Sequence, residues 1–313
     1  VCRMCQDWGV DLLAISAPDS RSHGSQSVEP TSFDPGWRKH LAKAAKQVVN
    51  IPVCTVTVIR EPAFAEQLLE DGITDFVGSA RAHLADPDWA NKARDCRDGD
   101  ITRCISCMRC YEAIHDAGAV RCSVNPRAGY ETTPEALRRT GARRKVAVIG
   151  GGPAGMEAAW VLGARDFDVT LYEKQPYLGG QVYLGSRSTS KHKNAWLIET
   201  LERRMLANGV RVNKAYTPDI EELKAEHYYA IIDASGAVPL IPKFIEGADK
   251  SKLICTPPEI LRGEKDFNGK TIVVIGSGFT GLETAELLSE RSKGNAVCVV
   301  ERLRAPTPGG SMD

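Results

Sequence analysis

Four cysteines stand close together in the middle of the chain. They follow the pattern C-x2-C-x2-C-x11-C, with thiols at Cys104, Cys107, Cys110 and Cys122. Such a group can form disulfides, bind zinc or ligate an iron–sulfur cluster. Zinc ribbons usually separate two C-x-x-C pairs widely, whereas three closely spaced cysteines can wrap one face of a cubane that a distant fourth completes. The spacing therefore favours a [4Fe–4S] cluster on these residues, with zinc or unligated thiols as the alternatives.

A glycine-rich turn, Gly150 to Gly155, follows the apolar run at 146–149. Gly150 permits a tight turn, Gly152 lets the backbone approach a pyrophosphate, and Gly155 lets helix and strand pack closely. The N-terminus of the following helix supplies N–H donors and the positive end of its dipole. Glu173 comes 23 residues after Gly150, where a carboxylate can accept hydrogen bonds from ribose hydroxyls. The pattern predicts a dinucleotide site.

The same plan recurs at 270–302, which makes it an internal duplication. A glutamate at the end of its second strand favours a free ribose diol, and hence NADH over NADPH. Arg302 and Arg304 stand nearby and could soften that preference. The predicted NAD contacts in this copy are Gly276, Gly278, Gly281 and Glu301.

The composition sets the class of protein. Among 313 residues, 40 Lys and Arg balance 40 Asp and Glu, so no basic patch indicates nucleic acid. No apolar run approaches the roughly 20 residues of a membrane span, and the chain opens on no signal peptide. Ten cysteines without secretory features indicate reduced thiols or metal ligands. We expect a cytoplasmic protein of two or three domains.

Residues 1–100 alternate short, β-branched apolar runs with amphipathic stretches. This alternation predicts three βα units with buried parallel strands. Because a (β/α)8 barrel needs eight such units, three can form either a small open sheet or part of a barrel. The predicted strands are 11–16, 53–59 and 75–80, and the predicted helices are 36–49, 62–72 and 87–96.

Both glycine-rich turns, together with "IIDASGAVP" at 231–239, resemble the flavoprotein reductases with two dinucleotide-binding domains, one for FAD and one for NAD(P)H. In the disulfide reductases of this type a redox cysteine pair follows a Gly-Gly. The corresponding stretch here, "LGGQVYLGSRS", contains no cysteine. Electrons must therefore leave the flavin by another route, and the four-cysteine loop is the obvious acceptor. The FAD contacts that the resemblance implies are Gly150, Gly152, Ala154, Gly155, Glu173, Lys174 and Gln181.

The segments "GSARAHLADPDW" and "CSVNPRAGYE", on either side of the first three cysteines, resemble the iron–sulfur flavoenzymes related to old yellow enzyme. That family includes 2,4-dienoyl-CoA reductase, 2-enoate reductase, bile-acid NADH:flavin oxidoreductases and trimethylamine dehydrogenase. The resemblance covers essentially the whole chain. It implies FMN-phosphate contacts at Ala80 and Arg81, while Thr57 and Val58 replace the glycine pair usual in the family near that phosphate.

The resemblance also implies an α/β architecture: the C-terminal portion of a (β/α)8 TIM barrel, a cluster loop, and Rossmann-like FAD and NAD(P) domains. It makes the chain a fragment that lacks the first part of the barrel and the C-terminal end. The implied boundaries are 1–100 for the last three βα units of an FMN-binding barrel, 101–130 for the cluster loop, 131–144 for a linker, 145–268 for the FAD (or ADP) domain and 269–313 for the start of the NAD(P)H domain.

On this resemblance we expect an oxidoreductase that passes electrons from NADH to FAD, then to the [4Fe–4S] cluster and to FMN. FMN would reduce an activated C=C bond of an enoyl-CoA, an enoate or a steroid enone. Two alternatives stay open: amine oxidation like that of trimethylamine dehydrogenase, with a structural ADP, and an electron-transfer module without its own catalytic site. The catalytic residues are expected N-terminal to residue 1. The expected partner is a small unsaturated substrate, a homo-oligomer is allowed, and neither nucleic acid nor a membrane is expected.

Overall fold

The computed structural model of the chain describes residues 1–16, 28–133, 137–241, 245, 251 and 253–302. The chain divides into two compact units, 1–138 and 139–313. The division falls inside the predicted linker 131–144, and the finer domain boundaries stay predictions. Parts of the predicted domains lie outside the described residues, namely 17–27, 134–136, 242–244, 246–250, 252 and 303–313, the last of which includes Arg304.

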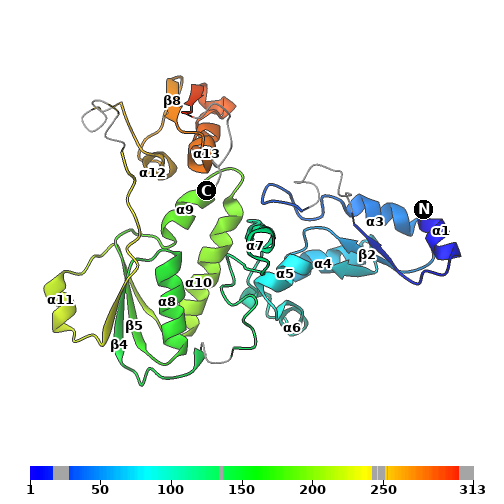
Figure 1. The fold of residues 1–313 in the computed structure, drawn as a ribbon, viewed down its shortest axis with the longest axis horizontal. Coiled ribbons are helices and arrows are strands. Elements are labelled where there is room, and N and C mark those ends of the chain that lie inside the picture. Colours follow the sequence, from blue (N-terminus) through cyan, green and yellow to red (C-terminus); the bar gives the residue numbers. More distant parts are fainter. Residues whose placement is uncertain (17–27, 134–136, 242–244, 246–250, 252, 303–313) are drawn as a thin grey trace. The chain divides into compact units, whose positions relative to one another are not determined.

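The first unit contains a three-stranded parallel sheet in the order β1-β2-β3, with Leu13 paired to Val53 and Cys54 paired to Phe76. Each strand is followed by helical structure, as three βα units require (Figure 1). The strands are β1 (Leu13–Ile15), β2 (Val53–Val56) and β3 (Phe76–Gly78), and the helices are α1 (Cys2–Asp7), α3 (Lys39–Lys46), α4 (Pro62–Glu70), α5 (Ala80–Ala85), α6 (Trp89–Arg94), the short η1 (Asp98–Asp100) and α7 (Arg109–Ala117).

The core of this unit forms around β2. Val53 and Leu68 are almost fully buried there, and α3 contributes Ala42 and Ala45 while its lysines stay at the surface. The prediction of buried strands is confirmed for β2 and wrong for β1 and β3, whose residues are only partly covered. The reason is that β1 and β3 are the outer strands of the described sheet.

Strand β2 is shorter than the predicted strand 53–59. It ends at Val56 because Val58 adopts a φ of 41°, which an extended strand does not allow. Helix α4 begins at Pro62 and stops before Gly72, which has a φ of 63°, as the sequence predicts. The carboxyl end of β2 therefore opens directly into an irregular segment that carries Arg60.

The second unit contains a four-stranded parallel sheet in the order β6-β5-β4-β7 and a separate parallel pair, β8 and β9. Helices α8 and α10 pack on one another beside the larger sheet (Figure 1). The strands are β4 (Lys145–Ile149), β5 (Asp168–Glu173), β6 (Arg211–Lys214), β7 (Ala230–Asp233), β8 (Thr271–Ile275) and β9 (Ala296–Val300), and the helices are α8 (Pro153–Ala164), α9 (Gly180–Ser186), η3 (His192–Asn194), α10 (Ala195–Ala207), α11 (Ile220–Ala225), α12 (Pro257–Leu261), α13 (Phe279–Leu288) and η4 (Arg291–Lys293).

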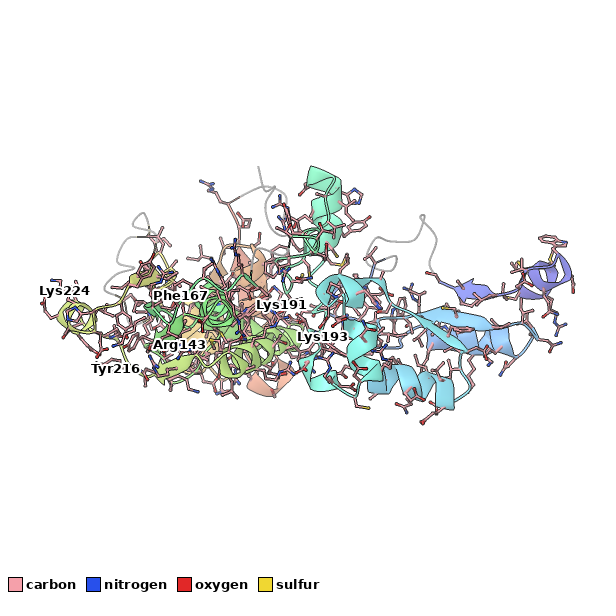
Figure 2. The ribbon with its side chains drawn as sticks, turned by 90° about the horizontal axis from the view of Figure 1, so that it is seen from below. Arg143, Phe167, Lys191, Lys193, Tyr216 and Lys224 are labelled. Carbon is pink, nitrogen blue, oxygen red and sulfur yellow. The ribbon has the colours of Figure 1, made fainter. Side chains whose placement is uncertain are left out.

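Both glycine-rich segments fold as strand, turn, helix and strand, as predicted. Strands β4 and β5 are buried almost throughout because each lies between two neighbouring strands and is covered by α8. Lys191, labelled in Figure 2, pairs with Glu283 of α13, and its ammonium lies 5.6 Å from the centroid of the Phe279 ring. These contacts fix the start of α13 against the segment before η3. None of the described helices is long and apolar enough to cross a membrane.

Candidate cofactor sites

The first glycine-rich turn joins β4 to α8 at the carboxyl end of the larger sheet. Gly150 has a φ of 108°, which glycine adopts at little cost, and its N–H donates to the Tyr172 carbonyl at 2.8 Å. A Cβ on Gly155 would lie 1.9 Å from the Gly150 carbonyl oxygen. A Cβ on Gly152 would meet no described atom within 4 Å. Gly155 thus packs helix against turn, and Gly152 leaves its surroundings open to a ligand.

Glu173 closes this turn from the end of β5. Its Oε2 accepts a hydrogen bond from the Gly151 N–H at 2.6 Å, and its Oε1 accepts one from the Gln175 N–H at 2.7 Å. A carboxylate has about four lone-pair positions, so acceptor capacity remains for a ribose diol. Glu173 therefore shapes the turn as well as offering a contact to a ribose.

The second turn reproduces this geometry. Gly276 has a φ of 103°, a Cβ on Gly281 would lie 2.1 Å from the Gly276 carbonyl oxygen, and a Cβ on Gly278 would meet no atom of the described chain within 4 Å. The Glu301 Oε2 accepts hydrogen bonds from the Ser277 N–H at 2.8 Å and its hydroxyl at 2.7 Å. The two turns therefore share one local structure.

The three other predicted FAD contacts lie around the first turn. Ala154 is exposed in the first turn of α8, and Lys174 is exposed directly after Glu173. Gln181 is exposed at the second residue of α9. Helix α9 reaches the turn because the Gly179 N–H donates to the Gly151 carbonyl at 2.7 Å. The structure thus brings the elements that carry the predicted FAD residues to one place.

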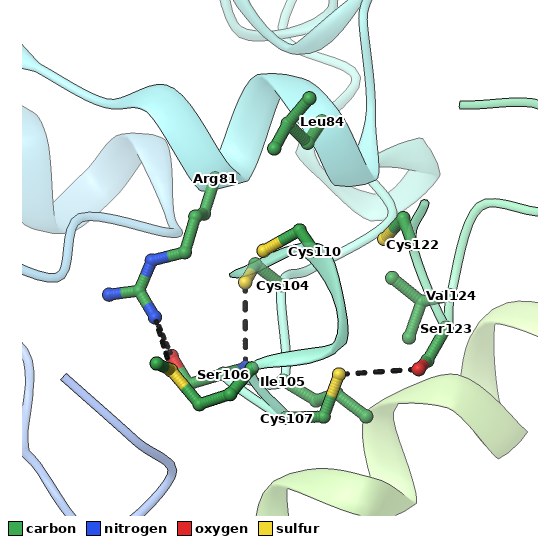
Figure 3. A pocket seen from close by; sticks show the side chains of 11 residues that line it. Arg81, Leu84, Cys104, Ile105, Ser106, Cys107, Cys110, Cys122, Ser123 and Val124 are labelled. Carbon is green, nitrogen blue, oxygen red and sulfur yellow. Dashed lines mark hydrogen bonds between the residues drawn. The ribbon is translucent and has the colours of Figure 1, made fainter. Parts of the chain in front are cut away.

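The four predicted cluster ligands lie in the first unit and line one cavity of about 20 Å³ (Figure 3). The loop before α7 folds tightly because Ser106 and Met108 adopt φ values of 53° and 65° between the cysteines. Helix α7 then carries Cys110 and ends at Gly118 in the left-handed conformation, which turns the chain back toward Cys122. Ser106 N–H donates to the Cys104 sulfur at 3.4 Å.

The arrangement of these thiols is not that of a single zinc ion. A zinc site needs its cysteine sulfurs at about 2.3 Å from the metal. Within the part of the chain that the structure describes, no three Cys, His, Asp or Glu side chains are arranged to hold a single metal ion. The four thiols nevertheless line one small cavity together. Burial raises the pKa of Cys110 and of Cys122, so binding of a metal must displace their protons.

A second cavity of the first unit, which we call the arginine cavity, has a volume of about 310 Å³ and opens at the carboxyl ends of β2 and β3. The predicted phosphate ligand Arg81 lines it, with Ala80 beside it at the start of α5. Arg81 donates from Nη2 to Glu29 Oε2 at 2.7 Å and from Nη1 to the Glu29 carbonyl at 2.6 Å. Arg38 also pairs with the Glu29 carboxylate.

Several donors in the arginine cavity have no partner among the described residues. They are the Arg38 Nη1 and the Arg60 Nε and Nη1, all of them buried. Unpaired buried N–H groups of a guanidinium are costly, and an anion such as the phosphate of FMN would satisfy them. Val58 lines the same cavity at a positive φ of 41°, so its backbone keeps a conformation that glycine favours.

Sequence reasoning identified Arg81 here but missed Arg38, Arg60 and Glu29. A signal for Arg60 existed, because it directly follows the predicted strand 53–59 and parallel-sheet proteins bind ligands beyond the carboxyl ends of their strands. No comparable signal marked Glu29 or Arg38, which lie far from Arg81 in sequence and meet it only through the fold.

Comparison with known proteins finds related oxidoreductases. Residues 144–312 match the family described as pyridine nucleotide-disulphide oxidoreductase. The chain is 40% identical over 307 residues to an NADH oxidase of Thermoanaerobacter brockii, which covers 97% of this chain and 46% of that protein. It is 34% identical over 297 residues to a bilirubin reductase of Mediterraneibacter gnavus, covering 94% of this chain and 45% of that one.

A solved structure of a 2-naphthoyl-CoA reductase in complex with 2-naphthoyl-CoA superimposes with a TM-score of 0.85 at 31% identity, covering 95% of this chain and 45% of that chain. The chain thus spans about half the length of the relatives it matches. The family and these relatives support FAD, FMN, a [4Fe–4S] cluster and NADH as cofactors. The chain belongs to the pyridine nucleotide-disulphide oxidoreductase family over residues 144–312 and, taken as a whole, to the iron–sulfur flavoenzymes related to old yellow enzyme.

Proposed function

We propose that this chain is the electron-relay part of an NADH-dependent flavin and iron–sulfur oxidoreductase that reduces an activated C=C bond. One observation carries the proposal: the same chain holds two matching dinucleotide turns, a cavity lined by four thiols, and a buried arginine cavity suited to a phosphate. A relative named for reducing 2-naphthoyl-CoA supports an unsaturated acyl-CoA or related enone as the substrate class.

The bound groups supply the redox chemistry, with NADH as hydride donor, FAD and the cluster as carriers and FMN as the reductant of the C=C bond. The protein positions these groups and excludes water. Gly152 and Gly278 would allow close approach of a pyrophosphate to the N-termini of α8 and α13. Glu173 and Glu301 would accept hydrogen bonds from ribose hydroxyls in addition to those from their own turns. Glu301 also disfavours a 2′-phosphate by charge, which supports NADH as the reductant.

The first unit would hold the other two groups. Cys104, Cys107, Cys110 and Cys122 would ligate the cluster, and Arg81 with Arg38 and Arg60 would hold the FMN phosphate. The consecutive β1-β2-β3 order supports the proposal that residues 1–100 are βα units of an FMN-binding TIM barrel, because neighbouring strands of such a barrel follow one another in sequence.

The test is anaerobic analysis of the full-length protein for iron, acid-labile sulfide and extractable flavin. We expect about four irons and four sulfides per chain, with FAD and FMN both released. Zinc without sulfide, or a protein without FMN, would contradict the proposed relay.

The direction of electron flow needs a second measurement. With an enoyl-CoA or a cyclic enone as acceptor, NADH should be consumed in proportion to the C=C bonds reduced. Oxidation of a small methylamine with no use of NADH would favour the amine dehydrogenase alternative instead.

A further inference from the structure

Arg60 lies where the arginine cavity and the cysteine loop meet. It is 3% exposed, and its backbone carbonyl accepts a hydrogen bond from Trp89 Nε1 at 2.9 Å, which fixes the segment after β2. Its Nη2 donates to the Ser106 hydroxyl, two residues beyond Cys104. The side chain thus reaches from the end of β2 into the loop that carries the thiols.

The same contacts bring Arg60 to a predicted cluster ligand. Arg60, Ser106 and Cys104 all line the arginine cavity, and Ser106 and Cys104 line the cysteine cavity as well. The Cys104 sulfur lies near enough to the Arg60 guanidinium to counter the effect of burial, which lowers the Arg60 pKa. A guanidinium keeps its proton in proteins, so this is a permanent buried positive charge.

The Ser106 residue holds this charge in place. Its hydroxyl accepts from Arg60 and, at 3.4 Å, from Arg81 Nη1, while its N–H donates to the Cys104 sulfur. Hydrogen bonds to ligand sulfurs and nearby charges are the means by which proteins tune iron–sulfur potentials. Buried charges act strongly because little solvent screens them.

We propose that Arg60 raises the reduction potential of the cluster held by Cys104 and thereby sets the direction in which electrons move between the cluster and the flavin in the arginine cavity. The inference rests on the proposed function, which places a cluster on these cysteines and a flavin in the arginine cavity. On reduction the cluster gains one electron and becomes more negative by one charge, which Arg60 stabilises. Arg60 keeps its proton throughout, so reduction takes up no proton at this residue.

The test is the midpoint potential of the cluster, measured by EPR-monitored redox titration of the anaerobic full-length protein. Arg60→Met removes the charge and the donors while keeping an unbranched side chain. We expect the equilibrium constant for cluster reduction to fall at least tenfold, which is about 59 mV for a one-electron couple. An unchanged potential in a variant that retains four irons would overturn the role of Arg60.

Two matched variants separate the effect of Arg60 on the cluster potential from the effects of losing any nearby charge or of weakening the flavin site. Arg109→Met removes a charge of the same sign from the start of α7, beside Cys110, where the Arg109 side chain is 41% exposed and pairs with Glu112 at 2.6 Å, so solvent should screen its loss. Arg38→Met removes a buried arginine from the arginine cavity whose described side-chain bonds go to Val56 and Glu29, and so reports the effect of a weakened flavin site. A shift in either variant as large as that of Arg60→Met would refute a specific role for Arg60.

If Arg60→Met loses its iron, Ser106→Ala tests the role of Arg60 instead. This variant keeps the charge of Arg60 but removes the hydroxyl that accepts its hydrogen bond. We expect a smaller shift in the same direction, and an unchanged potential would count against the proposal. A wild-type protein without an iron–sulfur EPR signal would overturn the proposed function. A wild-type signal with an unshifted variant would overturn only the role of Arg60.

Discussion

Replacing Gly155 with alanine would place a methyl carbon 1.9 Å from the Gly150 carbonyl oxygen. Carbon and oxygen atoms that are not bonded normally stay about 3.3 Å apart or more, so the turn and α8 would have to separate. The turn cannot easily retreat, because Gly150 is itself confined: a Cβ there would lie 2.3 Å from the Ala234 carbonyl oxygen. Overpacking typically costs about 1–3 kcal/mol. With backbone on both sides, we expect Gly155→Ala to lower the free energy of unfolding by about 3 kcal/mol.

Gly152→Ala is the matched control, since it adds the same methyl group three residues away. It meets no described atom within 4 Å, and Gly152 has a φ of −73°, which alanine readily adopts. We expect the free energy of unfolding of the apoprotein to change by less than about 0.5 kcal/mol. The methyl group would nevertheless occupy the space that a pyrophosphate needs. FAD affinity should therefore fall at least tenfold, or about 1.4 kcal/mol.

Two assays on the full-length protein give the answer. Urea unfolding of the flavin-free protein measures stability, and quenching of flavin fluorescence on titration with FAD measures affinity. We expect Gly155→Ala to lower the stability of the protein and Gly152→Ala to lower only its affinity for FAD. Wild-type FAD affinity in Gly152→Ala, or wild-type stability in Gly155→Ala, would refute the roles assigned to these glycines.

Three further outcomes are expected. Asp75→Asn should lower the free energy of unfolding at pH 7 by about 1 kcal/mol, because the Asp75 carboxylate accepts hydrogen bonds from Lys46 Nζ at 2.6 Å and the Val53 N–H at 2.9 Å, which lower its pKa. Because its pKa is lowered, the Asp75 carboxylate stabilises the fold at pH values above its unfolded pKa of about 3.9, and this stabilisation is lost as the pH falls. The urea midpoints of variant and wild type should therefore converge in acid. A constant gap between the midpoints would contradict this reasoning. Glu301→Gln removes the charge that repels a 2′-phosphate. It should lower the ratio of flavin-reduction rates with NADH and NADPH, measured by stopped flow, about tenfold, which is about 1.4 kcal/mol. An unchanged ratio of these rates would exclude that role of Glu301. Cys122→Ser should yield protein with less than the wild-type iron content while FAD binding is kept, and full iron content would remove Cys122 from the ligand set.

The dinucleotide turns could be predicted from the sequence almost completely. Their geometry is local, because a strand, a turn, a helix and an acid at a fixed distance follow one another along the chain. Gly150 and Gly276 therefore have nearly the same φ, as their matching sequences imply. That the four cysteines lie together could also be predicted, because the first three thiols are close in sequence. Helix α7 then ends in a turn that brings the chain back toward Cys122.

The arginine cavity could be predicted only in part. Arg81 follows a strand in a segment that resembles a known family, whereas Glu29, which accepts a hydrogen bond from it, lies 52 positions earlier in the sequence. Pairings of this kind depend on tertiary structure, and one sequence carries no periodic signal for them. The left-handed Val58 was also beyond sequence reasoning, because a β-branched residue disfavours that conformation and only its surroundings impose it.

The charges around the arginine cavity have a consequence for the choice of flavin. Its wall carries three guanidinium groups, of Arg38, Arg60 and Arg81, and one carboxylate, of Glu29, an excess of two positive charges apart from the cysteine thiols that also line it. A phosphate monoester carries about −1.5 to −2 at neutral pH, and the pyrophosphate of a dinucleotide carries about the same total, one charge on each phosphate. Either group would bring the wall close to electroneutrality, whereas like charges buried together without an anion cost free energy. The charge of this cavity therefore selects for a doubly charged phosphate group, and only its shape can tell FMN from FAD.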